Sequence, residues 1–113
     1  MSGNSLLATA KAMIVAYNAQ DVDTYVSHMT DDACEAVYRG AVLREGKEGT
    51  REGLKAMFAQ FPENRAEIIQ GYELGEFAVL HEKVWRSAAS EPFEVMSIYS
   101  FEGDKCSRVE FVR

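Results

Sequence analysis

Cysteine, histidine and proline are scarce in this sequence. Its 113 residues include two cysteines, Cys34 and Cys106, two prolines and two histidines, with no Cys-x-x-Cys motif. A disulfide framework or a zinc site needs several such residues at characteristic spacings, so neither is indicated. We predict that both cysteines are small buried side chains in a reducing compartment.

Long apolar runs and clusters of basic residues are also missing. No stretch approaches the roughly 20 apolar residues that a membrane span requires. The opening segment carries a single cation, Lys11, inside an apolar pattern, which is unlike a signal peptide. A net charge of −6 with scattered lysines and arginines argues against binding to a phosphate backbone. We therefore expect a soluble, cytoplasmic protein with neither nucleic acid nor membrane as a partner.

What is present is the composition of an ordinary globular domain. Hydrophobic residues make up 47% of the chain and charged residues 27%, which excludes a disordered or fibrous protein. A chain of this length buries roughly two-thirds of the surface that it exposes when unfolded. We expect one domain over residues 1–113.

Two helices are predicted close together near the start of the chain. Apolar residues recur every three or four positions over residues 6–17, which is typical of an amphipathic helix. Asn4 or Ser5 can cap this helix, and Asn18 tolerates the left-handed conformation that ends one. Asp21 is a suitable cap for a second, short helix. The two helices are joined by so short a link that we expect them to pack together.

The middle of the chain predicts a strand and a third helix. Turn formers at 30–33 precede a short strand at 34–40, and residues 41–49 are rich in turn formers. Residues 47–61 then have helical spacing up to the proline that follows them. Gly49 and Gly53 are each expected to weaken this helix by ~1 kcal/mol relative to alanine.

The last part of the chain predicts four strands. It is rich in β-branched and aromatic residues and is interrupted at Gly75, at 87–92, and at Gly103 with Asp104. These interruptions are typical of hairpin joints. Helices early in the chain and strands late predict an α+β domain with the helices on one face of an antiparallel sheet.

Three segments together resemble the nuclear-transport-factor-2-like superfamily, in its SnoaL-like and ketosteroid-isomerase-like branch. Residues 17–40 contain a helix that ends in an Asn-Ala-x-Asp turn, a short helix, and an Asp-Asp-Ala step into a strand. Residues 43–62 resemble the Gly-led third helix of that branch, and residues 93–113 its final hairpin. The resemblance implies a cone-shaped, cystatin-like α+β fold, in which three N-terminal helices pack in a curved mixed or antiparallel sheet with a pocket at the open end.

The resemblance does not extend to the isomerase chemistry. Isomerases of this fold use an aspartate base and an oxyanion hole made by a tyrosine and a protonated aspartic acid. Alignment on the matching segments places the tyrosine at Met13, the base at Val37 or Tyr38, and the second acid at Ser97. These positions hold none of the required groups, so steroid isomerisation is not implied.

The same alignment predicts which side chains face the pocket, although a shift of one residue would exchange the two faces of a strand. The predicted pocket is apolar and aromatic with a few polar groups, as small-molecule sites usually are. Its predicted lining is Met13, Tyr17, Val37, Leu54, Phe58, Val79, Lys83, Trp85, Ser97, Phe101, Val109 and Phe111.

His81 is the candidate acid or base of this pocket, because an imidazole transfers protons near neutrality. Tyr99 or Tyr38 could orient it or polarise a substrate oxygen. A histidine hydrogen-bonded within the core is the structural alternative. Glu82, its neighbour, is expected on the opposite face with Arg108 or Arg86.

Two functions stay open from the sequence. One is a protein that binds a small hydrophobic molecule without catalysing a reaction, which the missing isomerase groups favour. The other is an isomerase, cyclase or hydrolase that uses His81 as its acid or base. No cofactor is indicated, and Asp21, Asp31 and Asp32 suit caps and turns, so no metal is inferred. Apolar residues on the outer face of the last strands predict a homodimer.

Overall fold

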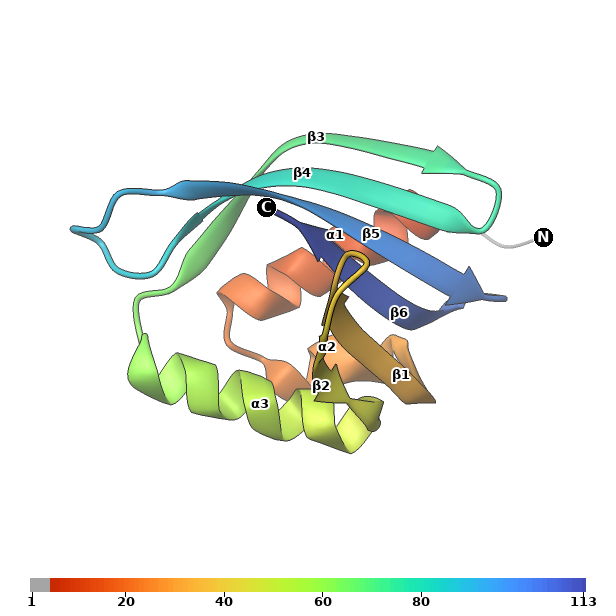
Figure 1. The fold of residues 1–113 in the computed structure, drawn as a ribbon, viewed down its shortest axis with the longest axis horizontal. Helices are drawn as coiled ribbons and strands as arrows, with labels where there is room; N and C mark the ends of the chain where they lie inside the picture. The colour runs from red at the N-terminus through yellow and green to blue at the C-terminus, as the bar shows by residue number, and fades with distance from the viewer. Residues whose placement is uncertain (1–4) are drawn as a thin grey trace.

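Residues 5–113 are described by a computed structural model, in which three helices pack against one six-stranded sheet (Figure 1). The helices are α1 (Leu6–Asn18), α2 (Val22–Ser27) and α3 (Gly46–Gln60). The strands are β1 (Met29–Val37), β2 (Val42–Glu45), β3 (Arg65–Leu74), β4 (Phe77–Trp85), β5 (Phe93–Glu102) and β6 (Lys105–Val112). The prediction of an α+β domain with four late strands is confirmed. None of the helices in the described part of the chain is long and apolar enough to cross a membrane.

The caps of α1 and α2 agree largely with the sequence. The Ser5 hydroxyl accepts a hydrogen bond from the backbone of Ala8, whereas Asn4 lies outside the described residues. Asp21 caps α2 as predicted. The left-handed residue between the helices is Gln20, with φ 57°, and not Asn18.

Asn18 has a different role, because it joins α1 to the sheet. Its side-chain amide donates to the carbonyl of Ala66 at 2.8 Å and accepts from the amide of Ala66 at 2.8 Å. This paired contact replaces one step of a β-ladder and holds the end of α1 against the start of β3.

Two predictions for the middle of the chain are wrong. The turn expected at 30–33 lies inside β1, which begins at Met29. The loop expected at 41–49 contains β2, which pairs with β1 in antiparallel register through Cys34 and Glu45. β1 pairs with β6 at Met29 and again from Cys34 onward, and the irregular stretch between these positions carries Asp31 and Asp32. Pairing on both sides of the stretch thus overrides the weak local preference of the two acids for turns.

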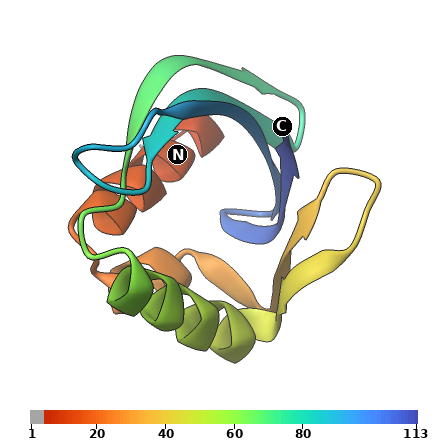
Figure 2. The ribbon, with the colours of Figure 1, turned by 60° about the vertical axis from the view of Figure 1, so that its left-hand side comes forward.

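The sheet is mixed and strongly curved. Its strand order is β2-β1-β6-β5-β4-β3, with β1 parallel to β6 and every other neighbouring pair antiparallel. The ribbon bends from β3 round to β1, and the three helices lie along the side that it leaves open (Figure 2). The concave face and the helices together enclose the core, so side chains that face inward from the strands meet those of α1 and α3.

The two cysteines carry free thiols: Cys106 is buried and Cys34 is half-buried. Burial raises the pKa of the Cys106 thiol to about 12, so this side chain is a protonated, apolar member of the core.

Candidate functional site

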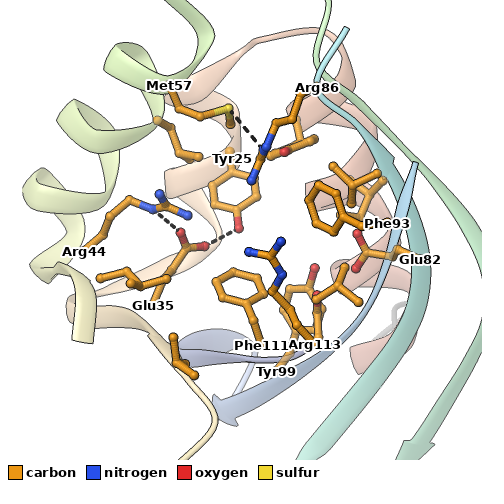
Figure 3. Close-up of a pocket in the computed structure, with 18 residues that line it drawn as sticks. Tyr25, Glu35, Arg44, Met57, Glu82, Arg86, Phe93, Tyr99, Phe111 and Arg113 are labelled. Carbon is orange, nitrogen blue, oxygen red and sulfur yellow. Dashed lines mark hydrogen bonds and ion pairs between the residues drawn. The ribbon is translucent and has the colours of Figure 1, made fainter. Parts of the chain in front are cut away.

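A cavity of about 230 Å³ lies between the helices and the concave face of the sheet (Figure 3). At about 30 Å³ for each water in the liquid, this is room for a molecule of one or two small rings. Half of the lining is apolar: Ile14, Val37, Leu43, Leu54, Met57, Val84, Phe93, Val95 and Phe111. The other half is polar or charged: Tyr17, Tyr25, Glu35, Arg44, Glu82, Arg86, Ser97, Tyr99 and Arg113.

Glu82 is the carboxyl group of this cavity that lacks a full set of partners. It lies in the middle of β4 and is 3% exposed. Its Oε2 atom has no hydrogen-bond partner among the described residues. Burial raises the pKa of Glu82 to about 7, against the opposing effect of the neighbouring Ser97 hydroxyl. Near neutral pH, Glu82 can therefore both accept and donate a proton.

Tyr99 contributes a neutral phenol to the same cavity. It lies on β5, the strand next to Glu82, and is 1% exposed. Burial, followed by the negative charge of Glu82, raises the pKa of Tyr99 well above its ordinary value. The phenol thus stays protonated and can donate a hydrogen bond to an oxygen of a bound molecule.

A second carboxylate, Glu35, is fully paired. The Tyr25 hydroxyl donates to its Oε2 at 2.5 Å, and Arg44 Nε donates to its Oε1 at 2.6 Å. Burial is the largest single effect on Arg44 and lowers its pKa, but the charge and hydrogen bond of Glu35, together with Tyr25 and Tyr17, raise the arginine's pKa overall. Glu35 is 0% exposed, and since both of its oxygens are occupied, it fixes the shape of the wall.

Arg86 is held in place at another part of the wall. Its Nη1 donates to Asn64 Oδ1 at 2.8 Å, and the Asn64 amide donates to the Tyr17 hydroxyl at 2.6 Å. The guanidinium carbon also lies 5.0 Å from the centre of the Phe93 ring. This arginine has no carboxylate partner among the described residues.

The residues predicted for the pocket lie in three places. Six are part of the cavity wall: Tyr17, Val37, Leu54, Ser97, Tyr99 and Phe111. Four are buried in the core without lining the cavity: Met13, Phe58, Phe101 and Val109. Tyr38 lies in the turn after β1, is 44% exposed, and stacks with the Arg39 guanidinium outside the cavity.

The predicted face of β4 is wrong by one residue. Ala78, Leu80, Glu82 and Val84 point inward, whereas Val79, His81, Lys83 and Trp85 belong to the outer face. His81 Nε2 lies 2.6 Å from Glu94 Oε1, and these side chains are 39% and 59% exposed. His81 is therefore neither the acid of the cavity nor a core histidine. Glu82, expected outside with Arg108 or Arg86, is the inward carboxyl group.

Sequence reasoning also missed Glu35, Arg44 and Arg113. A signal existed for the two inward acids, Glu82 and Glu35. Glu82 shares the period-two pattern of Leu80 and Val84, and Glu35 shares that of Ala33. No comparable signal marks the arginines, because each reaches the cavity from the end of an element or from an edge strand.

The family model for the SnoaL-like domain matches residues 10–109 of the chain. The chain belongs to the SnoaL-like family. A cystatin-fold protein from Novosphingobium aromaticivorans, itself uncharacterised, is 63% identical to this SnoaL-like protein and has a TM-score of 0.93, over 98% of this chain and 100% of the other. No curated protein sequence matches the chain.

More distant structures share the fold of this SnoaL-like protein. An NTF2-like protein of unknown function from Cytophaga hutchinsonii is 13% identical, with a TM-score of 0.81, over 98% of this chain and 91% of the other. A protein with a ketosteroid-isomerase-like fold from Catenulispora acidiphila is 15% identical, with a TM-score of 0.75, over 93% and 84% of the two chains. The predicted SnoaL-like family is confirmed, and the predicted fold is shared with the ketosteroid-isomerase-like structure.

The carboxyl group with a free oxygen in this SnoaL-like protein has its own position in the fold. The resemblance placed the isomerase groups at Met13, at Val37 or Tyr38, and at Ser97, whereas this carboxyl group is Glu82 on β4. In the antiparallel register of β4 and β5, Ser97 pairs with Leu80, two residues from Glu82. The carboxyl group is thus one strand away from the position of the isomerase acid.

Proposed function

We propose that this SnoaL-like protein binds a small, largely apolar molecule in its cavity and that Glu82 exchanges a proton with it. The observation that supports the proposal is the unpartnered Oε2 of a carboxyl group that is 97% buried in the cavity wall. Unpaired buried carboxyl groups are costly, and perturbed pKa values cluster at functional sites. A carboxyl group whose pKa is about 7 is well matched to general acid and base catalysis at neutral pH.

Tyr99 gives this proton transfer a second component. When a base removes a proton next to a carbonyl group, negative charge develops on the carbonyl oxygen, and a neutral hydrogen-bond donor in a dry site stabilises it. Tyr99 is such a donor, because its raised pKa keeps the phenol protonated. The reaction class that fits is proton abstraction next to a carbonyl, followed by return of the proton to the same or another carbon.

The test uses a small ketone whose exchange of hydrogen for deuterium needs only a base and an oxyanion donor. We expect 2-tetralone in deuterated buffer to exchange its α-hydrogens in a saturable manner with the protein, as followed by NMR. The rate should rise with pH through a midpoint near 7, because the ionised form of Glu82 is the base. Glu82→Gln should lower the rate by roughly 100-fold to 10,000-fold.

A matched control is Glu94→Gln, which changes a carboxylate on the outer face of β5. This variant should exchange the ketone at the original rate. If Glu82→Gln exchanges the ketone as fast as the unchanged protein, Glu82 is not the base. If the unchanged protein and Glu82→Gln bind 2-tetralone equally and neither promotes exchange, the cavity serves binding alone.

A further inference from the structure

The cavity concentrates positive charge in an acidic protein. The chain has a net charge of −6, yet three guanidinium groups, from Arg44, Arg86 and Arg113, meet two carboxyl groups in the cavity lining. Arg44 is neutralised by Glu35 at 2.6 Å. The charges of Arg86 and Arg113 have no carboxylate partner among the described residues.

Both unpaired arginines lie beside the same aromatic ring. The guanidinium carbons of Arg86 and Arg113 are 5.0 Å and 4.3 Å from the centre of the Phe93 ring. Figure 3 shows the Arg86 side chain entering the cavity from above and the Arg113 side chain from below, with Phe93 at the right. Two like charges next to one ring repel each other, and an anion between them would relieve this repulsion.

Arg86 is also prepared to receive such an anion. Its polar contacts with Asn64 and Met57 both use Nη1, so the Nη2 and Nε hydrogens are free of protein partners among the described residues. A guanidinium group presents its donors in a planar fork that matches the two oxygens of a carboxylate. Because Asn64 and two aromatic rings already orient the group, little side-chain entropy remains to be lost on binding.

From these contacts we propose that the molecule bound in the cavity is a small ring carboxylate, whose carboxylate group binds Arg86 and Arg113 while its ring lies against Phe93 and Phe111. This inference rests on the proposed function, since it names the class of molecule on which Glu82 acts. The apolar half of the cavity accommodates the ring. The carboxylate binds at the arginines, apart from Glu82.

The test compares two probes of the same shape, 2-naphthoate and its uncharged amide, 2-naphthamide, by isothermal titration calorimetry. Hydrogen bonds to charged groups contribute enough that the carboxylate should bind roughly 10-fold to 100-fold more tightly than the amide. Arg86→Gln should remove this preference, because glutamine keeps a polar group near Asn64 but carries no charge. Arg86→Lys should retain part of it and shows that a variant at this position folds.

Arg65→Gln is the matched control. Arg65 also stacks on an aromatic ring, with its guanidinium carbon 4.0 Å from the centre of the Trp85 ring, but it lies outside the cavity. This variant should keep the full preference for the carboxylate.

Three results would overturn the inference: equal binding of the two probes, tighter binding of the amide, or an undiminished preference in Arg86→Gln. Each of these leaves the proposed proton transfer at Glu82 standing. Failure of both probes to bind would also overturn the inference, while exchange of 2-tetralone would still test the proposed function. Loss of exchange chemistry with the carboxylate preference intact would remove only the proposed function.

Discussion

The side chain of Arg44 lies across the backbone of Gly53. A Cβ atom on Gly53 would come within 2.5 Å of Arg44 Cδ and 2.8 Å of Arg44 Cγ. The same arginine holds the buried carboxylate of Glu35 at 2.6 Å. Gly53 lies in the middle of α3, where helix propensity alone predicts that a glycine destabilises the helix. Its missing side chain leaves the space in which Arg44 of β2 reaches Glu35 in the cavity wall.

Gly49 and Gly53, two of the three glycines of α3, should therefore respond in opposite ways to alanine. Gly53→Ala displaces Arg44 from Glu35 and should lower the free energy of unfolding by roughly 1–3 kcal/mol. Gly49→Ala meets no atom within 4 Å and should raise it by roughly 0.5–1 kcal/mol, since alanine is the better helix former. Urea denaturation of the two variants measures both effects. Equal stabilisation by the two alanines would show that Arg44 is free to move aside.

Removal of the counter-charge itself should be more costly. Arg44→Met leaves Glu35, which is 0% exposed, with the Tyr25 hydroxyl as its one partner, and loss of one member of a buried ion pair typically costs roughly 3–5 kcal/mol. The double variant Glu35→Gln with Arg44→Met contains no unpaired charge and should recover most of this loss. The coupling free energy from the double-mutant cycle is the measurement. Additive effects would contradict an ion pair.

Glu82 should make the protein less stable as the pH rises from acid to neutral. The folded-state pKa is about 7 and the ordinary value is 4.5, so the unfolded chain loses this proton first. Below pH 4.5 the carboxyl group is protonated in both states and costs nothing. Between these two values the free energy of unfolding falls by about 1.4 kcal/mol per pH unit, or about 3 kcal/mol in total.

Glu82→Gln removes this titration and leaves every other group in place. The difference in unfolding free energy between the variant and the unchanged protein should therefore grow from pH 4.5 to pH 7 in favour of the variant, and stay constant above that range. Denaturation at a series of pH values gives this difference. A difference that is the same at every pH would show that Glu82 titrates normally in the folded state.

Local signals in the sequence predicted those parts of the fold that local chemistry determines. Asp21 caps α2 through its own side chain, and Gly75 and Gly103 adopt positive φ at the hairpin joints. Asp31 and Asp32 show the limit of such signals. They favour turns locally, but they lie in β1 between Met29 and Cys34, which pair with the distant strand β6, and no local pattern contains that information.

The face of β4 could not be predicted from its own periodicity. Both alternating sets of the strand are largely apolar, with Val79 and Trp85 in one and Leu80 and Val84 in the other, so the pattern does not distinguish inside from outside. The face was predicted from the alignment with the family, and the polar members gave no signal against it, since burial of Glu82 is less favourable than burial of His81. Functional sites are places where a sequence departs from such preferences. His81, which points outward, contacts Glu94 on the outer face of the sheet.

The outer face that carries His81 provides the last prediction, which is a homodimer through the sheet. A hollow on this face is lined by Gln70, Tyr72, Val79, His81, Glu94, Val95, Met96 and Val112. Tyr72 and Met96 are 61% and 39% exposed, and large exposed apolar groups bordered by charges mark association surfaces. We expect a second copy of the chain to contact this surface in a two-fold arrangement, in which His81 and Glu94 of each copy border the same contact.

Met96→Lys should weaken the expected dimer, because a two-fold interface contains residue 96 of both copies. Desolvation of an unpaired charge costs several kcal/mol, so the dimer dissociation constant from analytical ultracentrifugation should rise by roughly two orders of magnitude or more. Val15→Lys adds the same charge on α1, at a side chain that is 69% exposed, and should leave the constant unchanged. A monomer at every concentration of the unchanged protein, or equal weakening by both lysines, would mean that this face is not where two copies meet.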